Sequence, residues 1–323
     1  MKTVSAVKRA PETALAAPRK KKDNILKRFW KTRFLFVLFL PTLIYYIMFH
    51  YIPMWGVTFA FYDYDIIGGI KESAWVGLHH FKVFFDSPDM WMITRNTLSL
   101  SLQSLFISFP AVIIFALLLN EIRNLKFKKV VQTVSYLPHF LSVVVVCGLI
   151  NNLLSPDGGG VNQVIELFGG EPIYFMIKKE WFRPIWLISE LWASLGWGTI
   201  IYLAAISSVD PSLYEAARLD GANRFRQIIN ITVPSIMPTI ATMFILKVGH
   251  VMDASMEKAM LLSNPTIYEV SEIISTYVFT RGLNGAMEFS YSTAVSLYKS
   301  LVNLALLLFA NWASKKATDT SVI

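Results

Sequence analysis

Apolar runs of about 20 residues recur along this chain, and they limit its fold more than any other feature. A run of that length can cross a hydrocarbon core of roughly 30 Å as a helix. The charged fraction is 16%, against roughly 25% in an average soluble domain. The sequence therefore predicts an all-α integral membrane protein with about six transmembrane helices. The expected spans are 34–52, 97–119, 130–152, 184–206, 235–253 and 293–313.

The distribution of lysine and arginine predicts the orientation of these spans. Twenty of the 30 basic residues fall in the pieces that a cytoplasmic N-terminus would place inside, and eight fall in the outer loops. Because cytoplasmic loops carry the basic excess, we expect both termini inside. The same excess explains the net charge of +8 without a nucleic-acid partner. The inner pieces are 1–33, 120–129, 207–234 and 314–323, and the outer loops are 53–96, 153–183 and 254–292.

The N-terminus is strongly basic and precedes the first apolar run. Residues 1–33 hold eleven Lys and Arg, and no small-residue cleavage site follows His50. This pattern favours an uncleaved first span over a signal peptide, with some affinity of the tail for anionic membrane lipid. We expect a basic cytoplasmic tail over 1–30, a transmembrane domain over 31–317 and a short C-terminal tail over 318–323.

Two outer loops have a distinctive composition. Loop 53–96 is rich in aromatic residues that can pack on the membrane surface. In the next outer loop, Ser155–Gly160 is a turn, and the amphipathic stretch Val161–Phe168 is expected to lie along the interface. The two three-span halves share no motif, whereas secondary transporters usually contain internal repeats.

The loop over 210–234 is polar, carries both signs of charge and lies between two apolar segments. Asp210 can cap a helix that begins at Pro211, where a missing N–H costs nothing. Glu215 is then expected near the positive end of that helix, and Gly221 can leave it in a left-handed conformation. A second helix, about 222–231, would return to the membrane, where Pro234 opens the fifth span. The sequence thus predicts a cytoplasmic helix-turn-helix.

The spacing in this loop is Glu-Ala-Ala, three residues, Gly, nine residues and Ile-x-x-Pro. It resembles the signature loop of permease subunits of bacterial ATP-binding-cassette importers, with Val233 where Leu is usual. The resemblance implies a coupling helix that docks in a cleft on a separate ATPase subunit. The residues that it assigns to this coupling are Glu215, Ala216, Ala217, Asp220, Gly221 and Pro234.

Further motifs are similar to the carbohydrate branch of these importers, the relatives of the larger maltose permease subunit, over about residues 30–317. The motifs are Trp75–Phe81, Asn96–Leu98, Tyr136–Phe140, Gly196–Gly198, Tyr202–Ala205, Asn264-Pro265, Val270–Glu272 and Thr276–Val278. Those of the loop after span five resemble a subgroup tied to oligosaccharides and polysaccharide fragments. The resemblance implies binding-protein-dependent sugar import across the bacterial inner membrane by alternating access. The implied partners are a second permease subunit, an ATPase dimer that holds ATP and Mg, and an extracytoplasmic solute-binding protein.

Several chemistries lack support in the residues. No Gly-Lys dipeptide occurs, so a phosphate-binding loop that ends in Gly-Lys-Ser/Thr is missing and the chain is not the ATPase of that kind. We expect a non-catalytic subunit that binds no cofactor itself. Cys147 lies alone in an apolar run, and the adjacent His79 and His80 cannot share a helix face, so no metal site is expected.

Ionisable residues inside spans predict the substrate path, because they are costly in lipid and tend to face the bundle interior. A sugar path also needs aromatic faces beside hydrogen-bonding groups. The candidates are Glu190, Trp192 and Trp197 in span four, Lys247, His250 and Asp253 in span five, and Tyr298, Lys299 and Asn303 in span six. The alternative is structural: the two lysines and two carboxylates sum to zero charge and could pair to hold helices together.

Two other function classes remain as alternatives. A stand-alone ion- or proton-coupled secondary transporter would explain the charges within the spans, but it would leave the 210–234 loop unexplained. A membrane enzyme acting on lipid-linked sugar would need paired catalytic carboxylates, and no such pair clusters at an interface.

Overall fold

A computed structural model describes residues 32–285 and 287–318. The predicted basic tail over 1–30 and most of the predicted C-terminal tail lie outside the described residues. Contacts divide the chain into two units, the first ending at Trp55 and the second beginning at Gly56. The structure is almost entirely helical, and the only strands among the described residues are the short antiparallel pair β1 (Tyr62–Asp63) and β2 (Ala74–Trp75).

Five described helices are long and apolar enough to cross a membrane, and a bent pair supplies a sixth candidate. The prediction of about six spans is thereby confirmed. The five are Arg33–Phe61, Pro88–Glu121, Lys179–Ser207, Arg224–Gly249 and Phe289–Lys316. The segments of the first are α2 (Arg33–Tyr46), η1 (Ile47–Tyr51) and η2 (Pro53–Phe61), and those of the second are α4 (Pro88–Gln103), η3 (Ser104–Ser108) and α5 (Phe109–Glu121). The others are α9 (Lys179–Ser207), then α11 (Arg224–Gln227) with η6 (Ile228–Thr232) and α12 (Val233–Gly249), and α16 (Phe289–Thr318).

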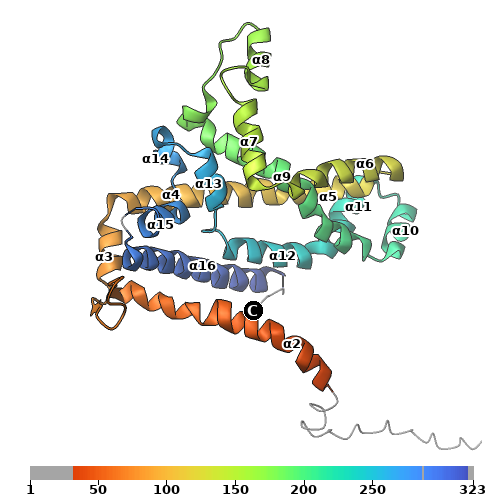
Figure 1. Cartoon of the computed structure of the whole chain (residues 1–323). Helices are drawn as coiled ribbons and strands as arrows, with labels where there is room; N and C mark the ends of the chain where they lie inside the picture. Colours follow the sequence, from red (N-terminus) through yellow and green to blue (C-terminus); the bar gives the residue numbers. More distant parts are fainter. Residues whose placement is uncertain (1–31, 286, 319–323) are drawn as a thin grey trace, which may run out of the picture. The chain divides into compact units, whose positions relative to one another are not determined.

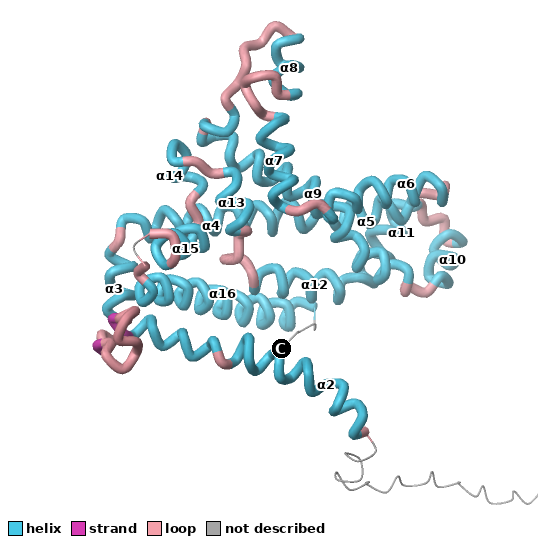
Figure 2. Tube along the Cα trace, viewed as in Figure 1, coloured by secondary structure: helices cyan, strands magenta, loops and turns pink. Residues whose placement is uncertain are grey.

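The third predicted span, over 130–152, is sharply bent. Helix α6 (Leu125–Tyr136) and the 3-10 turn η4 (Leu137–Phe140) are followed, at an angle of 101°, by α7 (Val143–Leu153). Pro138 lies in η4, and the Ser142 side chain caps α7 by accepting a hydrogen bond from the N–H of Val145. Proline and a new cap together end one helix and begin another. Figure 2 shows the loop at this break and the change of direction after it.

Proline shapes the long helices in a recurring way. Each five-residue π-helical segment ends two residues before a proline: η1 before Pro53, η3 before Pro110 and η6 before Pro234. Proline cannot donate a hydrogen bond, and its ring clashes with the carbonyl four residues earlier. The wider π turn displaces that carbonyl, so the helix continues through the proline.

Short helices join the long ones. On the side of the second unit that holds the predicted outer loops lie α3 (His79–Asp86), η7 (Pro265–Ile267), α14 (Tyr268–Ser271) and α15 (Ile274–Gly282). Helix α13 (Met256–Leu262) packs on α7, while α8 (Gly160–Leu167) and η5 (Phe175–Ile177) follow α7 in the chain. Helices α10 (Pro211–Leu219) and α11 lie at the end of this unit opposite to α3 and α15 (Figure 1). The predicted inner loops 120–129 and 207–234 therefore share one end.

The second unit is held together by pairs of long helices and by polar anchors. Helix α16 packs on α12, and α9 packs on α5 and α6. The buried Asn96 amide donates to the carbonyl oxygens of Glu269 and Glu272, and Thr97 Oγ1 accepts from the N–H of Ile274 at 3.0 Å. Since buried polar groups require partners, the Asn96–Leu98 motif fastens the outer loop to α4.

Candidate functional site

Helix α10 in the 210–234 loop begins with the predicted cap. Asp210 Oδ1 accepts from the N–H of Ser212 at 2.9 Å, and Pro211 occupies the first helical position. This backbone hydrogen bond lowers the pKa of the Asp210 carboxyl from its ordinary value, because it stabilises the anion. The Asp210 cap and the place of Pro211 at the start of the helix were both expected from the sequence, and both are confirmed.

The same helix ends in a left-handed turn at Gly221. Gly221 has φ of 75°, its N–H bonds to the carbonyl of Arg218 at 3.1 Å, and the N–H of Ala222 bonds to the carbonyl of Ala217 at 2.8 Å. These two bonds form a Schellman motif, in which glycine takes the conformation that other residues disfavour. The helix therefore has a defined start, a defined end and a fixed exit direction.

The expectation that Glu215 benefits from the helix dipole is wrong. Helix α10 starts at Pro211 and carries no acidic residue in its first turn, and the dipole effect fades within that turn. Glu215 and Ala216 are exposed, and no described residue forms an ion pair or hydrogen bond with the Glu215 side chain. Three large apolar side chains of this region are also exposed: Leu213 at 48%, Phe225 at 69% and Leu219 at 90%. The helix thus presents a free carboxylate and uncovered apolar surface.

The return helix differs from its prediction. The Asn223 side chain caps α11 by accepting from the N–H of Arg226, and the chain then runs through η6 into α12 as one continuous helix. Pro234 therefore lies inside this helix rather than at the start of a new one, because η6 accommodates it.

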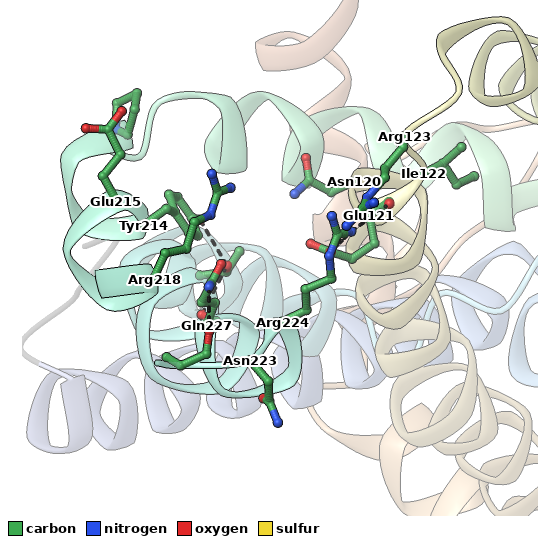
Figure 3. A pocket seen from close by; sticks show the side chains of 13 residues that line it. Asn120, Glu121, Ile122, Arg123, Tyr214, Glu215, Arg218, Asn223, Arg224 and Gln227 are labelled. Atoms are coloured by element: carbon green, nitrogen blue, oxygen red, sulfur yellow. Dashed lines mark hydrogen bonds and ion pairs between the residues drawn. The ribbon is translucent and has the colours of Figure 1, made fainter. Parts of the chain in front are cut away.

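A cleft of about 850 Å³ lies beside α10 (Figure 3). Its second wall is the 120–123 segment at the end of α5. Arg224 Nη1 donates to Glu121 Oε2 at 2.9 Å and to the Glu121 carbonyl at 3.3 Å. On the other wall, the Tyr214 hydroxyl lies 2.9 Å from Thr232 Oγ1. The loop is consequently tied by side chains to two long helices, Pro88–Glu121 and Arg224–Gly249.

A second pocket, of about 280 Å³, gathers four of the residues predicted for the substrate path. Glu190, Lys247, His250 and Asp253 all line it, together with residues of α4, η3 and α13. Lys247 Nζ lies 3.7 Å from Glu190 Oε1, and Ser104 donates a hydrogen bond to the same carboxylate oxygen. The structure thus brings together α4, η3, α9 and α12 at a charged centre.

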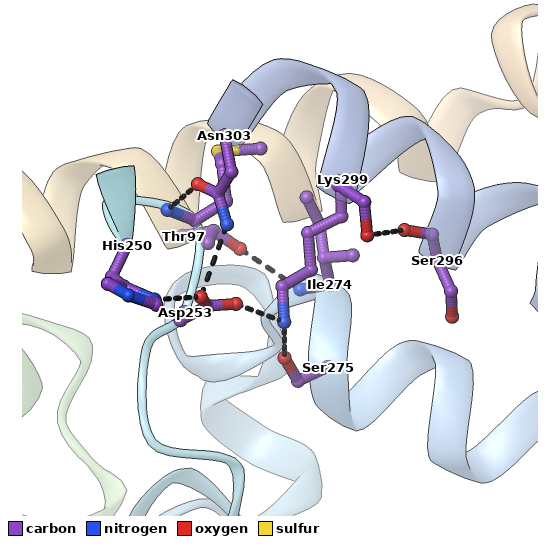
Figure 4. Close-up of polar contacts among 10 residues, drawn as sticks. Thr97, His250, Asp253, Ile274, Ser275, Ser296, Lys299 and Asn303 are labelled. Atoms are coloured by element: carbon purple, nitrogen blue, oxygen red, sulfur yellow. Dashed lines mark hydrogen bonds and ion pairs between the residues drawn. The ribbon is translucent and has the colours of Figure 1, made fainter. Parts of the chain in front are cut away.

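Asp253 is the hub of an adjoining network (Figure 4). Its carboxylate contacts Lys299 Nζ at 2.7 Å, His250 Nδ1 at 3.0 Å and Asn303 Nδ2 at 3.2 Å. Asn303 Oδ1 accepts from the N–H of Met252, and Lys299 also donates to Ser275 Oγ. The four predicted charges therefore form two ion pairs, Lys247–Glu190 and Lys299–Asp253, that link different helices.

A Lys299→Met chain tests whether the second pair does more than hold helices together. We expect transport to fall by about tenfold, because the Asp253 carboxylate, the hub of the network, loses its closest cation. The measurement is uptake into vesicles by the assembled protein, with thermal unfolding followed in parallel. Wild-type uptake by a well-folded Lys299→Met protein would remove Lys299 from the substrate path.

The aromatic candidates lie elsewhere. The Trp197 ring stacks on His139 with ring centroids 4.4 Å apart, and Trp192 lines a different, mainly apolar cleft with residues of α6. Tyr298 packs against Phe84 and Phe85. The aromatic ring that does line the charged pocket belongs to Trp186, one turn before Glu190.

Lys258 also lines this pocket, and the sequence reasoning missed it. Its side chain is 9% exposed, its Nζ donates to the Trp186 carbonyl at 2.7 Å, and it lies 4.3 Å from the centroid of the Trp186 ring. Burial lowers the pKa of Lys258 to about 8, although the Glu190 carboxylate acts in the opposite direction. The sequence feature that could have identified Lys258 is a single lysine within the otherwise mostly apolar helix α13.

Among the described residues, no group of three or more His, Cys, Asp and Glu could hold a metal ion. The charged pocket offers ammonium, imidazole and carboxylate groups to a polar solute. The loop carries exposed apolar side chains and the exposed Glu215 carboxylate.

The family profile described as "Binding-protein-dependent transport system inner membrane component" matches residues 96–319. The polygalacturonan/rhamnogalacturonan transport system permease protein YteP of Bacillus subtilis is 46% identical over 322 residues, which cover 100% of both chains. Protein LplB of the same organism is 42% identical over 286 residues, covering 88% of this chain and 90% of that protein.

Solved structures give a consistent result. A bacterial alginate ABC transporter, in complex with its alginate pentasaccharide-bound periplasmic protein, contains a chain that is 40% identical in sequence. That similarity covers 93% of this chain and 100% of the other, with a TM-score of 0.85. A second structure, of a transporter that imports the acidic polysaccharide alginate, gives a TM-score of 0.84 at the same identity and covers 92% of this chain and 100% of that one.

Proposed function

The chain belongs to the family of binding-protein-dependent transport system inner membrane components, and we propose that it is the permease subunit of an ATP-driven importer of oligosaccharides in the bacterial cytoplasmic membrane. The resemblance to permeases of carbohydrate importers is confirmed. A permease of this family is a transport subunit rather than a catalyst. The observation that carries the proposal is helix α10, which is capped at both ends and presents an unpaired carboxylate and exposed apolar side chains.

The partners are inferred from the exposed side chains of α10 and α11 that nothing in the described chain covers. Leu213, Leu219 and Phe225 are uncovered at the end of the unit that carries the predicted cytoplasmic loops. An ATPase subunit with a complementary cleft would cover them and would pair a cation with Glu215. The proposed assembly contains this chain, a second permease, an ATPase dimer that holds ATP and Mg²⁺, and an extracytoplasmic solute-binding protein.

The contacts of the loop support a route for force. Closure of the ATPase dimer would move α10 as a rigid body. Tyr214 would transmit that movement to η6 through Thr232, while Arg224 would transmit it to the end of α5 through Glu121. The two long helices reached in this way both line the charged pocket. Movement at the loop would therefore open and close the path that contains Glu190 and Lys247, which is alternating access.

The charged pocket supports a hydrophilic path between the helices. Ionisable side chains within membrane spans mark solute and ion pathways. We assign the lining of the path to Glu190, Lys247, His250 and Asp253, with Lys299 and Asn303 behind Asp253. Trp192, Trp197 and Tyr298 lie outside this pocket, so any contact of theirs with substrate would occur at another stage of transport.

A stand-alone secondary transporter is the competing function. Its main support was the charge within the spans, and these charges form pairs that link helices. Uptake by the purified chain alone, under a proton gradient and without ATP, would favour that function. Co-purification of an ATPase and a second permease in mild detergent would favour the importer.

Charge reversal at Glu215 tests the coupling role directly. We expect Glu215→Lys to reduce uptake by at least tenfold, because the helix would present the wrong charge to the ATPase cleft. Glu215→Gln is the matched control and should lose less, since it keeps the size of the side chain. The measurements are uptake, ATP hydrolysis and the affinity of the solute-binding protein for its ligand, which should stay unchanged. Full transport by Glu215→Lys would contradict the coupling assignment.

A further inference from the structure

Lys258 is the one lysine lining the charged pocket that forms no ion pair with a described carboxylate. Lys247 pairs with Glu190 and Lys299 pairs with Asp253, whereas no described carboxylate lies within ion-pair distance of Lys258. Its described hydrogen-bond acceptor is a neutral carbonyl, that of Trp186. A buried ammonium group without an anionic partner is costly, so its presence at the wall of a cavity requires an explanation.

The charges around the pocket add up to an anion-binding site. Two carboxylates, Glu190 and Asp253, and two ammonium groups, Lys247 and Lys258, line the pocket. Lys299 contacts Asp253 without lining the pocket, so the cluster of five charges has one positive charge in excess even with His250 neutral. The excess is located at Lys258, where the Trp186 carbonyl and ring hold the ammonium group in place. Lys258 lines the cavity of about 280 Å³, which is close to the small end of pockets for small molecules.

We propose that Lys258 binds a carboxylate of an acidic sugar that passes through this pocket. The substrates would then be oligosaccharides of uronic acids rather than neutral sugars, an inference that rests on the proposed importer function. The ammonium–carboxylate contact is a charge-assisted hydrogen bond, which gains strength in a site with little water.

The ordinary structural role of Lys258 is to fasten α13 to α9 through the Trp186 carbonyl. That role and the proposed one make different predictions. A purely structural lysine would affect all substrates equally and would show its effect in stability. A carboxylate-binding lysine would affect acidic substrates selectively and would depend on its own protonation.

The test uses the complete transporter in proteoliposomes, with its solute-binding protein present in excess. The probes are trigalacturonate and the neutral trigalactose obtained by reducing its carboxyl groups. We expect Lys258→Met to lower trigalacturonate uptake by at least tenfold, while Lys258→Arg stays within about threefold of wild type because it keeps the charge. Basal ATP hydrolysis and thermal unfolding report whether Lys258→Met is folded.

A pH profile of the wild type supplies a second readout that needs no variant. Trigalacturonate uptake, divided by basal ATP hydrolysis, should fall as pH rises through about 8, where Lys258 loses its proton. Lys258→Arg should remove this decline. The other titratable and charged groups that face Lys258 or share its pocket are Glu190, Cys147, Lys247, His250 and Asp253.

The outcomes separate the two levels of the proposal. Wild-type uptake of trigalactose but not of trigalacturonate would overturn the acidic-sugar inference and leave the importer function standing. Equal trigalacturonate uptake by folded Lys258→Met and by wild type would also overturn it, as would a flat wild-type pH profile. An absence of ATP-dependent uptake of every oligosaccharide that the solute-binding protein binds would overturn the proposed function itself.

Discussion

A Gly221→Val chain is expected to fold and to assemble but to lose ATP-coupled transport. Gly221 has φ of 75°, a left-handed conformation that costs a residue with a Cβ roughly 1–2 kcal/mol and a β-branched residue more. An added Cβ would meet no other atom within 4 Å, so the penalty is confined to the backbone at the exit of α10. One or two kcal/mol shifts a local equilibrium by a factor of about 5–30. Substrate-stimulated ATP hydrolysis and uptake should fall by a similar factor.

The matched control is Gly221→Asn, because asparagine enters the left-handed region far more readily than valine. It should keep most of the coupling. Basal ATP hydrolysis and the amount of assembled complex should be similar in both variants, since Gly221 is exposed and an added Cβ there would meet no other atom within 4 Å. Equal transport by the valine and asparagine variants would show that the exit angle of α10 does not matter for coupling.

The spans could be predicted from the sequence because lipid offers no hydrogen-bond partners. An apolar segment in lipid must form its backbone hydrogen bonds within itself, as a helix does. Their ends could not be placed so well. The second long helix begins at Pro88 rather than at 97. Ser87 caps it by accepting a hydrogen bond from the N–H of Asp89, and Pro88 occupies the first turn, so the helix starts before the polar residues that lower the local hydropathy. The bend in the third span escaped prediction because α6 and α7 are together as apolar as a straight span. Hydropathy averages over a window and does not register a local cap such as Ser142.

The helix-turn-helix over 210–234 was predictable because its signals are local: a cap at Asp210, a proline after it and a glycine at the exit. The residues that line the charged pocket were harder to predict from the sequence. Helical spacing placed Lys247 and His250 on one face correctly, but the partner of each charge comes from a distant segment, as Asp253 does for Lys299. Trp197 follows Glu190 by seven residues, about two turns of α9, so helical spacing alone would place the two on one face. The 3-10 turn η4 supplies His139 and Phe140, on which Trp197 packs instead.

The largest loss of folded protein is expected from Gly196→Val. A Cβ at Gly196 would lie 2.2 Å from the carbonyl oxygen of Ser135 and 2.4 Å from its carbonyl carbon, both of them backbone atoms of α6. A flexible side chain could move aside, but a helix backbone cannot do so without breaking its contacts. Helix α6 with η4 is about 26 Å long, at about 1.5 Å per residue in α6 and 2.0 Å in the 3-10 turn, which is too short to cross roughly 30 Å alone. It therefore depends on its packing against α9.

Overpacking in a tight core costs typically 1–3 kcal/mol, and a backbone clash belongs at the upper end or beyond. We therefore expect Gly196→Val to give little monodisperse protein in mild detergent and Gly196→Ala to show a clear fall in unfolding temperature. Gly148→Ala is the matched control, because Gly148 lies within α7 and an added Cβ there would meet nothing within 4 Å. It should be neutral or slightly stabilising, since alanine favours a helix more than glycine does. Normal yield and stability of Gly196→Val would mean that α6 and α9 do not approach each other this closely, and the short α6 would then need support from another chain.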